Sequence, residues 1–191
     1  MTKLAIIPVM VSLASVYPMA QAPATHSHDT TSPTSVTAAK ATLQDAQGKA
    51  IGTATLRDSS AGVLVKLDLQ SVAPGPHAFH VHAIGKCEAP DFTTAGGHFN
   101  PTTKKHGLFA TGGPHAGDMP NLFVPGDGKL SIEVLVPSVT LGAGPTSLLD
   151  TDGSALMLHA TGDDYASDPA GNAGGRIGCG VLRADLAKVG G

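Results

Sequence analysis

Tryptophan is absent from the sequence, tyrosine occurs twice, and charged residues make up only 14% of the chain, with a formal net charge of −3. Without a strong basic balance, a protein that binds nucleic acid through a positively charged surface is excluded. No run of 18 apolar residues follows the N-terminal segment, so a membrane-spanning helix is excluded as well. The 24 glycines and 14 prolines are spread as turn signals between short runs rich in Val and Leu. This pattern indicates β-structure with long loops and excludes a helical bundle.

The N-terminus is typical of a secretory signal peptide. Lys3 is followed by an apolar stretch from Leu4 to Val16 and then by Ala20-Gln21-Ala22, a cleavage site of the A-x-A kind. We therefore expect cleavage after Ala22 and export to the periplasm or the medium. The predicted divisions of the chain are a signal peptide over 1–22, a flexible leader over 23–34 and one domain over 35–191.

The chain has only two cysteines, Cys87 and Cys179. In an exported protein, one intramolecular disulfide between them is the simplest outcome. Two buried free thiols, or a pair of metal ligands, are the alternatives that the cysteine count leaves open.

Alternation of apolar and polar residues is clearest over 63–69, with the period of two that suits a half-buried strand. Similar short runs predict eight strands, at about 36–44, 50–57, 63–69, 78–84, 119–124, 129–136, 154–161 and 176–183. Hairpin turns are expected at 45–49, 58–62 and 125–128. The fold class is therefore all-β, an antiparallel sandwich or flattened barrel with no second domain.

Three connections between the predicted strands are long. Residues 85–118 are rich in Gly, Pro and His and residues 162–175 in Gly and Asp, whereas 137–153 is plainer. Loops of this length in a small β domain are usually functional. Six of the nine histidines fall at strand ends or on the first loop: His80, His82, His98, His106, His115 and His159.

These histidines predict a metal site. His80 and His82 are two residues apart on a predicted strand, so their imidazoles leave the same face and can chelate one ion. The loop supplies the three imidazoles and one carboxylate of a tetrahedral zinc site, from His98, His106, His115 and Asp118. Of the remaining histidines, His159, considered by itself, would also suit a buried core position. His77 is expected in a turn, and His26 and His28 are expected to be solvated.

Taken together, the motifs of the chain resemble those of the copper,zinc superoxide dismutase family, of the bacterial secreted type. The matching segments are Phe79-His80-Val81-His82, Gly96-Gly97-His98-Phe99-Asn100-Pro101, Lys105-His106-Gly107, His115-Ala116-Gly117-Asp118 and the run from Gly171 to Gly180. They span roughly residues 36–185. The resemblance implies an eight-stranded Greek-key barrel and the dismutation of superoxide to dioxygen and hydrogen peroxide.

The resemblance also implies the ligands of the two cofactors. Copper would be held by His80, His82, His98 and His159, and zinc by His98, His106, His115 and Asp118. Imidazole suits both ions, whereas the carboxylate favours the redox-silent one. In the family's mechanism the bridging imidazole, here His98, leaves copper on reduction, takes a proton and later supplies it to the reduced substrate.

Three further residues take their roles from the resemblance. Arg176 would guide the anion beside copper, because a guanidinium holds small anions by charge-assisted hydrogen bonds. The Cys87–Cys179 disulfide would tie the long loop to the barrel. Asp163 would accept hydrogen bonds from the outer ring nitrogens of His80 and His106, with Asp164 as its competitor.

The loop 162–175 departs from animal enzymes, which carry basic residues there. It contains Asp163, Asp164 and Asp168 but no Lys or Arg. Steering of the anion would therefore depend on other residues, and the candidates are Lys86, Lys104 and Lys105, each of which also suits a plain solvated position.

Two other functions fit parts of the sequence. A secreted copper-buffering protein would fit the histidines of the leader, but storage requires neither Arg176 nor a bridging ligand. A structural β-sandwich leaves the six histidines unexplained. The expected partner is superoxide, with no nucleic acid and no membrane span. A homodimer is compatible with the resemblance, although the sequence carries no signature of a dimer contact.

Overall fold

Ten strands and one 3₁₀ turn form the part of the chain that this computed structural model describes, residues 38–185. They are β1 (Ala38–Gln44), β2 (Ala50–Ser59), β3 (Gly62–Leu69), β4 (Gly75–His77), β5 (Phe79–His82), η1 (Thr93–Ala95), β6 (Leu122–Val124), β7 (Leu130–Val136), β8 (Ala155–His159), β9 (Arg176–Val181) and β10 (Arg183–Ala184). No helix within these residues is long and apolar enough to cross a membrane. The predicted signal peptide and leader, with His26 and His28, lie outside the described residues.

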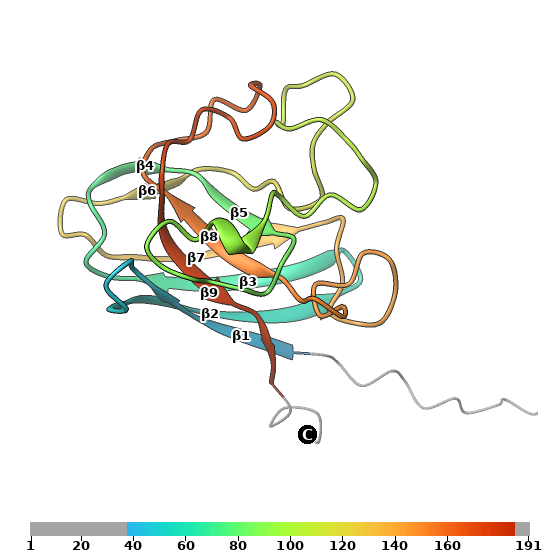
Figure 1. The fold of residues 1–191 in the computed structure, drawn as a ribbon, viewed down its shortest axis with the longest axis horizontal. Coiled ribbons are helices and arrows are strands. Elements are labelled where there is room, and N and C mark those ends of the chain that lie inside the picture. The colour runs from blue at the N-terminus through green and yellow to red at the C-terminus, as the bar shows by residue number, and fades with distance from the viewer. Residues whose placement is uncertain (1–37, 186–191) are drawn as a thin grey trace, which may run out of the picture. The chain divides into compact units, whose positions relative to one another are not determined.

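Eight of the strands form one curled antiparallel sheet (Figure 1). Seven follow one another in the order β5-β8-β9-β1-β2-β3-β7, and β10 pairs with β1 beside this path. The remaining two strands, β4 and β6, pair with each other. The prediction of an all-β fold with an eight-stranded antiparallel sheet is confirmed, although the strand predicted at 119–124 is β6, outside this sheet, and β10 is the eighth strand.

Two local predictions are wrong. His77, expected in a turn, ends β4 and is only 3% exposed; the strand has three residues, too few for periodicity to reveal. The turn at 125–128 is present, since Gly128 N–H donates to the carbonyl of Pro125 at 3.0 Å. It is not a hairpin, because the strands that it joins pair with other strands: β6 with β4, and β7 with β3.

The sheet contains two kinds of strand. In β1, β2 and β3 most residues alternate between buried and exposed, and the inward side chains, such as Leu43, Leu56 and Leu67, form the main core. β5 and β8 are buried along their whole length. Phe79 of β5 and Leu158 of β8 belong to the same core. The residues that alternate with them point to the opposite face of the sheet, and because they are buried too, another part of the chain must cover that face.

Candidate metal centre

Three of the predicted ligands lie on that opposite face. His80 is paired with Met157, and His82 with Ala155, between β5 and β8. Residues directly opposite each other in an antiparallel pair share a face of the sheet. His159 follows Met157 by two residues on β8, so it emerges on the same face.

The connection after β5 covers these histidines. Its first part is tied to β9 by a disulfide between Cys87 and Cys179, with Cα atoms 5.7 Å apart, which confirms the predicted pairing. The following turn η1 lies in front of β8 in Figure 1, and Phe92 beside it is buried in one cluster with Cys179 of β9. Solvent is thereby excluded from the histidine face: His80 and His82 are at most 1% exposed.

Five buried side-chain polar atoms in residues 38–185 have no hydrogen-bond partner, and four are histidine nitrogens of this centre. They are Nδ1 of His80 and Nε2 of His82, His98 and His159. These four residues can bring their ligand atoms within 4.8 Å of one another. Because each unpartnered buried nitrogen costs roughly 1–3 kcal/mol, four together indicate that a metal ion is their partner. An all-imidazole set suits copper.

Burial and outer contacts prepare these rings for a metal. His82 Nδ1–H donates to the carbonyl of Gly96 at 2.9 Å, which leaves Nε2 free to bind. Burial lowers the pKa of His82 to about 2, that of His159 to about 3 and that of His80 to about 4. The rings are therefore neutral at physiological pH, the form that coordinates metals.

A second set of atoms converges beside the first, Nδ1 of His98, His106 and His115 and Oδ1 of Asp118. Asp118 Oδ1 lies 2.9 Å from Nδ1 of His98, 3.1 Å from that of His106 and 3.4 Å from that of His115. The Nδ1 atoms of His115 and His98 are 3.4 Å apart. A tetrahedral zinc ion with bonds of about 2.0–2.1 Å has ligand atoms about 3.3 Å apart, so the set fits zinc.

The carboxylate of Asp118 is fixed by backbone groups of the same loop. Its Oδ2 accepts hydrogen bonds from Gly107 N–H at 2.9 Å and His115 N–H at 3.0 Å. Burial raises the pKa of Asp118, but the hydrogen bonds from His98 and Gly107 outweigh burial and leave the pKa well below its ordinary value. The group is therefore a carboxylate, with Oδ1 turned to the imidazoles.

His98 is common to both sets. Its Nε2 is one of the four unpartnered nitrogens, and its Nδ1 belongs to the second set. The ring centroids of His98 and His80 are 4.1 Å apart. An imidazole with one nitrogen in each set can bridge two ions. His106, by contrast, shares the second set and a third group, with His80 and Asp163.

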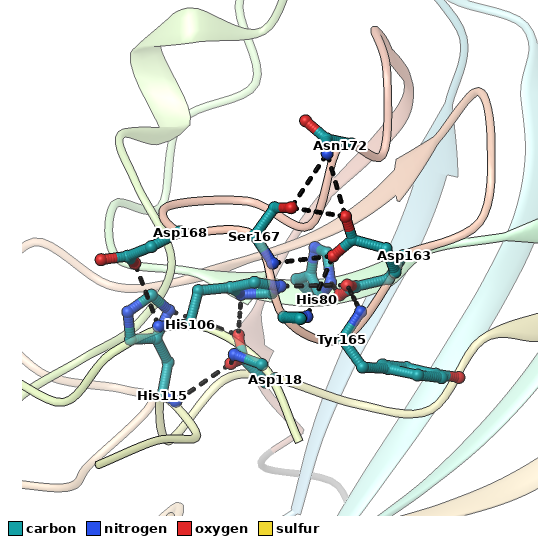
Figure 2. A network of polar contacts seen from close by, with 12 residues as sticks. His80, His106, His115, Asp118, Asp163, Tyr165, Ser167, Asp168 and Asn172 are labelled. Atoms are coloured by element: carbon teal, nitrogen blue, oxygen red, sulfur yellow. Dashed lines mark hydrogen bonds and ion pairs between the residues drawn. The ribbon is translucent and has the colours of Figure 1, made fainter. Parts of the chain in front are cut away.

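Asp163 connects the two sets by contacting one ring of each (Figure 2). Its Oδ2 lies 2.7 Å from Nε2 of His80, and its Oδ1 lies 3.0 Å from Nε2 of His106, so both predicted contacts are present. Burial raises the pKa of Asp163, whereas the hydrogen bonds from the two rings lower it, to about 2 on balance. The carboxylate accepts from one ring of each set and fixes which nitrogen of that ring faces the metal.

Of the other acidic residues of the loop 162–175, Asp164 bonds within that loop and Asp168 bonds to the loop that carries His106. Asp164 is exposed and accepts hydrogen bonds from Ser167 and Asn172, which hold its pKa below the ordinary value. Asp168 Oδ1 accepts from His106 N–H at 3.0 Å. The acidic loop is therefore partly a scaffold for the second set, and Asp168 is a supporting residue that sequence reasoning missed.

Two more supporting residues have no motif of their own. The side chain of Asn121 pairs with the backbone of Asp163: Asp163 N–H donates to Oδ1 at 2.7 Å, and Nδ2 donates to the carbonyl at 2.9 Å. Gly171 has a φ of +64°, and a Cβ there would collide with Asp163 and His106. The backbone therefore passes these side chains at a distance that only glycine allows.

Arg176 lies at the edge of the first set. It pairs with His159 across β8 and β9, and its guanidinium donates to the carbonyls of Phe92 and Gly96 at 2.6 and 2.7 Å. Since Gly96 also accepts from the ring of His82, one carbonyl holds both side chains. The three lysines considered for steering, Lys86, Lys104 and Lys105, are all exposed on the loop.

Comparisons with known proteins agree with this geometry. The family model described as copper/zinc superoxide dismutase matches residues 50–182. A superoxide dismutase [Cu-Zn] of Aquifex aeolicus is 50% identical over 145 residues, which cover 75% of this chain and 86% of that protein. A superoxide dismutase [Cu-Zn] of Caulobacter vibrioides is 40% identical over 148 residues, covering 76% of this chain and 85% of that one.

Solved structures give the same answer for the fold. A superoxide dismutase-like protein from Bacillus subtilis superposes with a TM-score of 0.74 at 39% identity, covering 75% of this chain and 97% of that chain. The Cu/Zn superoxide dismutase from Brucella abortus superposes with a TM-score of 0.64 at 30% identity, covering 76% and 99%. With two adjoining sets of metal-binding side chains on this fold, the chain belongs to the copper/zinc superoxide dismutase family.

Proposed function

We propose that the chain converts two superoxide ions and two protons into dioxygen and hydrogen peroxide, as an oxidoreductase with copper and zinc cofactors. The observation that carries this proposal is the group of four unpartnered imidazole nitrogens, one of which belongs to a ring shared with the zinc-type set. Copper, when bound, supplies the one-electron couple that dismutation requires, whereas zinc has no redox chemistry and stays divalent.

The proposed division of ligands follows the donor atoms. His80, His82, His98 and His159 would hold copper, and His98, His106, His115 and Asp118 would hold zinc. The mixed imidazole and carboxylate set is the harder of the two, which supports zinc there. Asp163, bonded to one ring of each set, would couple the affinities of the two sites.

His98 is proposed to hold and deliver a proton at Nε2. That nitrogen has no protein partner, while Nδ1 lies 2.9 Å from Asp118 within the zinc-type set, so a bound zinc ion would hold the ring by Nδ1 and leave Nε2 for a proton. Substrate oxidation needs no proton, but formation of hydrogen peroxide needs two. A ring fixed at one nitrogen keeps the proton on the side of the site where the reduced substrate lies.

Arg176 is proposed to hold the anion. Its guanidinium is half-buried, and burial lowers the pKa of the group, yet a guanidinium stays protonated at any physiological pH. The two carbonyl acceptors at Phe92 and Gly96 fix its plane next to the copper-type set. A fixed positive group at that place favours a small anion over neutral dioxygen or hydrogen peroxide.

The decisive experiment measures metal content and superoxide removal on the same purified sample, first metal-free, then with zinc alone, copper alone and both. Activity is expected only in the samples that contain copper, with about one copper and one zinc per chain in the last. Stoichiometric copper without superoxide removal would instead favour a copper-buffering protein.

Export is a second part of the proposal. The Cys87–Cys179 disulfide supports it, because structural disulfides persist in oxidising compartments. The test is mass spectrometry of the protein recovered from the periplasm and the medium, where a mature N-terminus at residue 23 is expected. The homodimer stays a prediction, and light scattering of the purified protein measures it.

A further inference from the structure

A methionine lies among the histidines of the copper-type set. Met157, the middle residue of β8, is 0% exposed and is paired with His80 on β5 and with Cys179 on β9. Residues directly opposite each other share a face of the sheet, so the side chain of Met157 lies on the histidine face. It packs there with Phe92 and Cys179, outside the main core. Neither proposed set of metal ligands uses it.

The rings of the copper-type set converge over this residue. His82 is paired with Ala155, and His159 follows Ala155 by four residues, about 13 Å along the strand. The ring centroids of His82 and His159 are nevertheless 5.7 Å apart, so the two rings lean toward the middle of the β5–β8 pair. The rings of His80 and His159 lie 5.0 Å apart in the same place. Since Met157 is midway between Ala155 and His159, its side chain lies at the base of the set.

A methionine side chain is long and flexible enough to place its sulfur among these rings. Directly opposite residues have Cβ atoms about 4.5–5.5 Å apart, which makes Met157 and His80 neighbours. The sulfur is two bonds beyond Cβ, and the rotatable bonds of methionine let it adapt to an irregular space. The packing partners of Met157 in its cluster include Phe92, Ala95 and Cys179, so the sulfur lies in an apolar surrounding that solvent does not reach.

Thioether sulfur is a soft ligand that selects copper(I), whereas imidazole suits copper and zinc alike. In the proposed function Nε2 of His98 holds a proton in the reduced state, so three imidazole nitrogens remain for copper. A soft donor at the base of the set would then contribute where the fourth nitrogen is lost. Leucine would fill a similar volume without this property, as Leu156 and Leu158 do on the opposite face.

We propose that Met157 is a soft ligand for reduced copper, which binds copper(I) through its thioether sulfur and raises the reduction potential of the site. The proposal rests on the proposed function, because it takes His80, His82, His98 and His159 as the copper ligands. Dismutation oxidises one superoxide ion and reduces another. The reduction potential of the site therefore decides how evenly the two halves of the reaction proceed.

The first experiment compares two substitutions of methionine by leucine, which nearly conserve volume. Met157→Leu removes the sulfur from the histidine face. Met119→Leu is the matched control, because Met119 is 1% exposed but belongs to the main core. Competition with chelators specific for copper(I), copper(II) and zinc measures the three affinities.

We expect Met157→Leu to weaken copper(I) binding by about tenfold, which lowers the reduction potential by about 59 mV for a one-electron couple. Its copper(II) and zinc affinities should stay as in the parent protein. Met119→Leu should change none of the three affinities.

The second experiment tests the contact itself by X-ray absorption. In the expected mature chain, residues 23–191, methionine occurs only at positions 119 and 157. Met119→Leu produced with selenomethionine therefore carries one selenium atom, at residue 157. Its selenium spectrum should show a copper neighbour in the copper(I)-loaded protein and none in the protein loaded with zinc alone. Because residue 157 is not replaced, this measurement decides even where Met157→Leu does not fold.

Equal copper(I) affinity in the parent and Met157→Leu would overturn the proposal, as would a selenium spectrum without a copper neighbour. Equal losses of copper(I) and copper(II) affinity in Met157→Leu would also overturn it, because the residue would then act by packing alone. Superoxide removal by the parent separates this failure from failure of the proposed function. If the parent binds copper and removes superoxide while Met157→Leu keeps its copper(I) affinity, only the role of Met157 is wrong; if the parent binds no copper, the proposed function fails and this role fails with it.

Discussion

Arg176 lies opposite His159 although the register of the neighbouring pairs would place Ile177 there. Leu158 is paired with Gly178, and the next pair is His159 with Arg176, so Ile177 is an extra residue in β9. Such a bulge changes the face of the sheet on which the side chains beyond it lie. Ile177 packs against the main core, and Arg176 emerges on the face of the histidines.

The first prediction tests Arg176 by charge. Arg176→Glu is expected to lower the rate of superoxide removal by about 100-fold or more, because a preorganised donor to the anion is replaced by a repelling charge. Arg176→Lys should lose less, since it keeps the charge but cannot donate to the carbonyls of Phe92 and Gly96 in the same planar geometry.

Metal content should be unchanged in both variants, which separates anion binding from metal loss. Raising the ionic strength should slow the parent protein more than the Glu variant, because salt screens the attraction. An unchanged rate in Arg176→Glu would remove this residue from the site.

The second prediction concerns the shared ring of His98. In the parent protein, addition of zinc should alter the copper spectrum, because one imidazole contributes a nitrogen to each set. His98→Ala removes that link while His80, His82 and His159 still offer three nitrogens to copper. Zinc should then leave the copper spectrum of the variant as it was. An equal change in both proteins would contradict a bridge through His98.

The third prediction concerns the disulfide between Cys87 and Cys179. It joins two residues 92 positions apart and ties the connection after β5, which covers the metal-binding histidines, to β9. Replacing both cysteines by Ala should lower the free energy of unfolding by about 2–5 kcal/mol. Thiol titration of the unfolded, unreduced parent protein should find no free thiol, whereas two reactive thiols would show that the bond does not form in the exported protein.

Sequence alone predicted the fold class and most of the centre, and the reason is visible in β5. Its four residues place His80 and His82 on one face and Phe79 and Val81 on the other, a pattern of period two that any strand imposes. The loop residues His98, His106, His115 and Asp118 predicted a zinc-type set, whereas the division of ligands between copper and zinc, with His98 shared and His159 included, came from the resemblance to the family.

The supporting residues were not predictable in the same way. Asn121 and Asp168 act on backbone groups of other residues, and such contacts leave no spacing or composition in the sequence. The extra residue Ile177 is likewise indistinguishable from its neighbours until the register of β9 against β8 is known. Asp163 was predicted from the resemblance to a family, which already contains this geometry.

The fourth prediction compares the adjacent residues Asp163 and Asp164. Asp163→Asn should weaken zinc binding by about 10–100-fold, because an amide presents one acceptor where His80 and His106 each need one. Copper binding should be less affected when the amide oxygen takes the place of Oδ2, which makes the shorter of the two contacts, 2.7 Å to His80 against 3.0 Å to His106. Asp164→Asn should change metal affinity little, because its contacts to Ser167 and Asn172 are exposed and local. A larger loss of zinc affinity in Asp164→Asn than in Asp163→Asn would show that the role of supporting the ligand rings was assigned to the wrong carboxylate.

The last prediction concerns the metal-free protein in acid. Burial lowers the pKa of His80, His82 and His159 to about 4, 2 and 3, against about 6.5 in the unfolded chain. Between pH 6.5 and about 4 the unfolded state therefore binds more protons than the folded state, so stability rises with pH and is lost as the pH falls. From pH 7 to pH 5, the free energy of unfolding is expected to fall by about 2 kcal/mol or more.

Denaturant titrations at the two pH values measure this difference, and His82→Asn, which removes one titrating ring, should make the fall shallower. Stability that is constant or rises on acidification would contradict the prediction, because it would mean that these three rings are not held in the neutral form that binds copper in the folded metal-free protein.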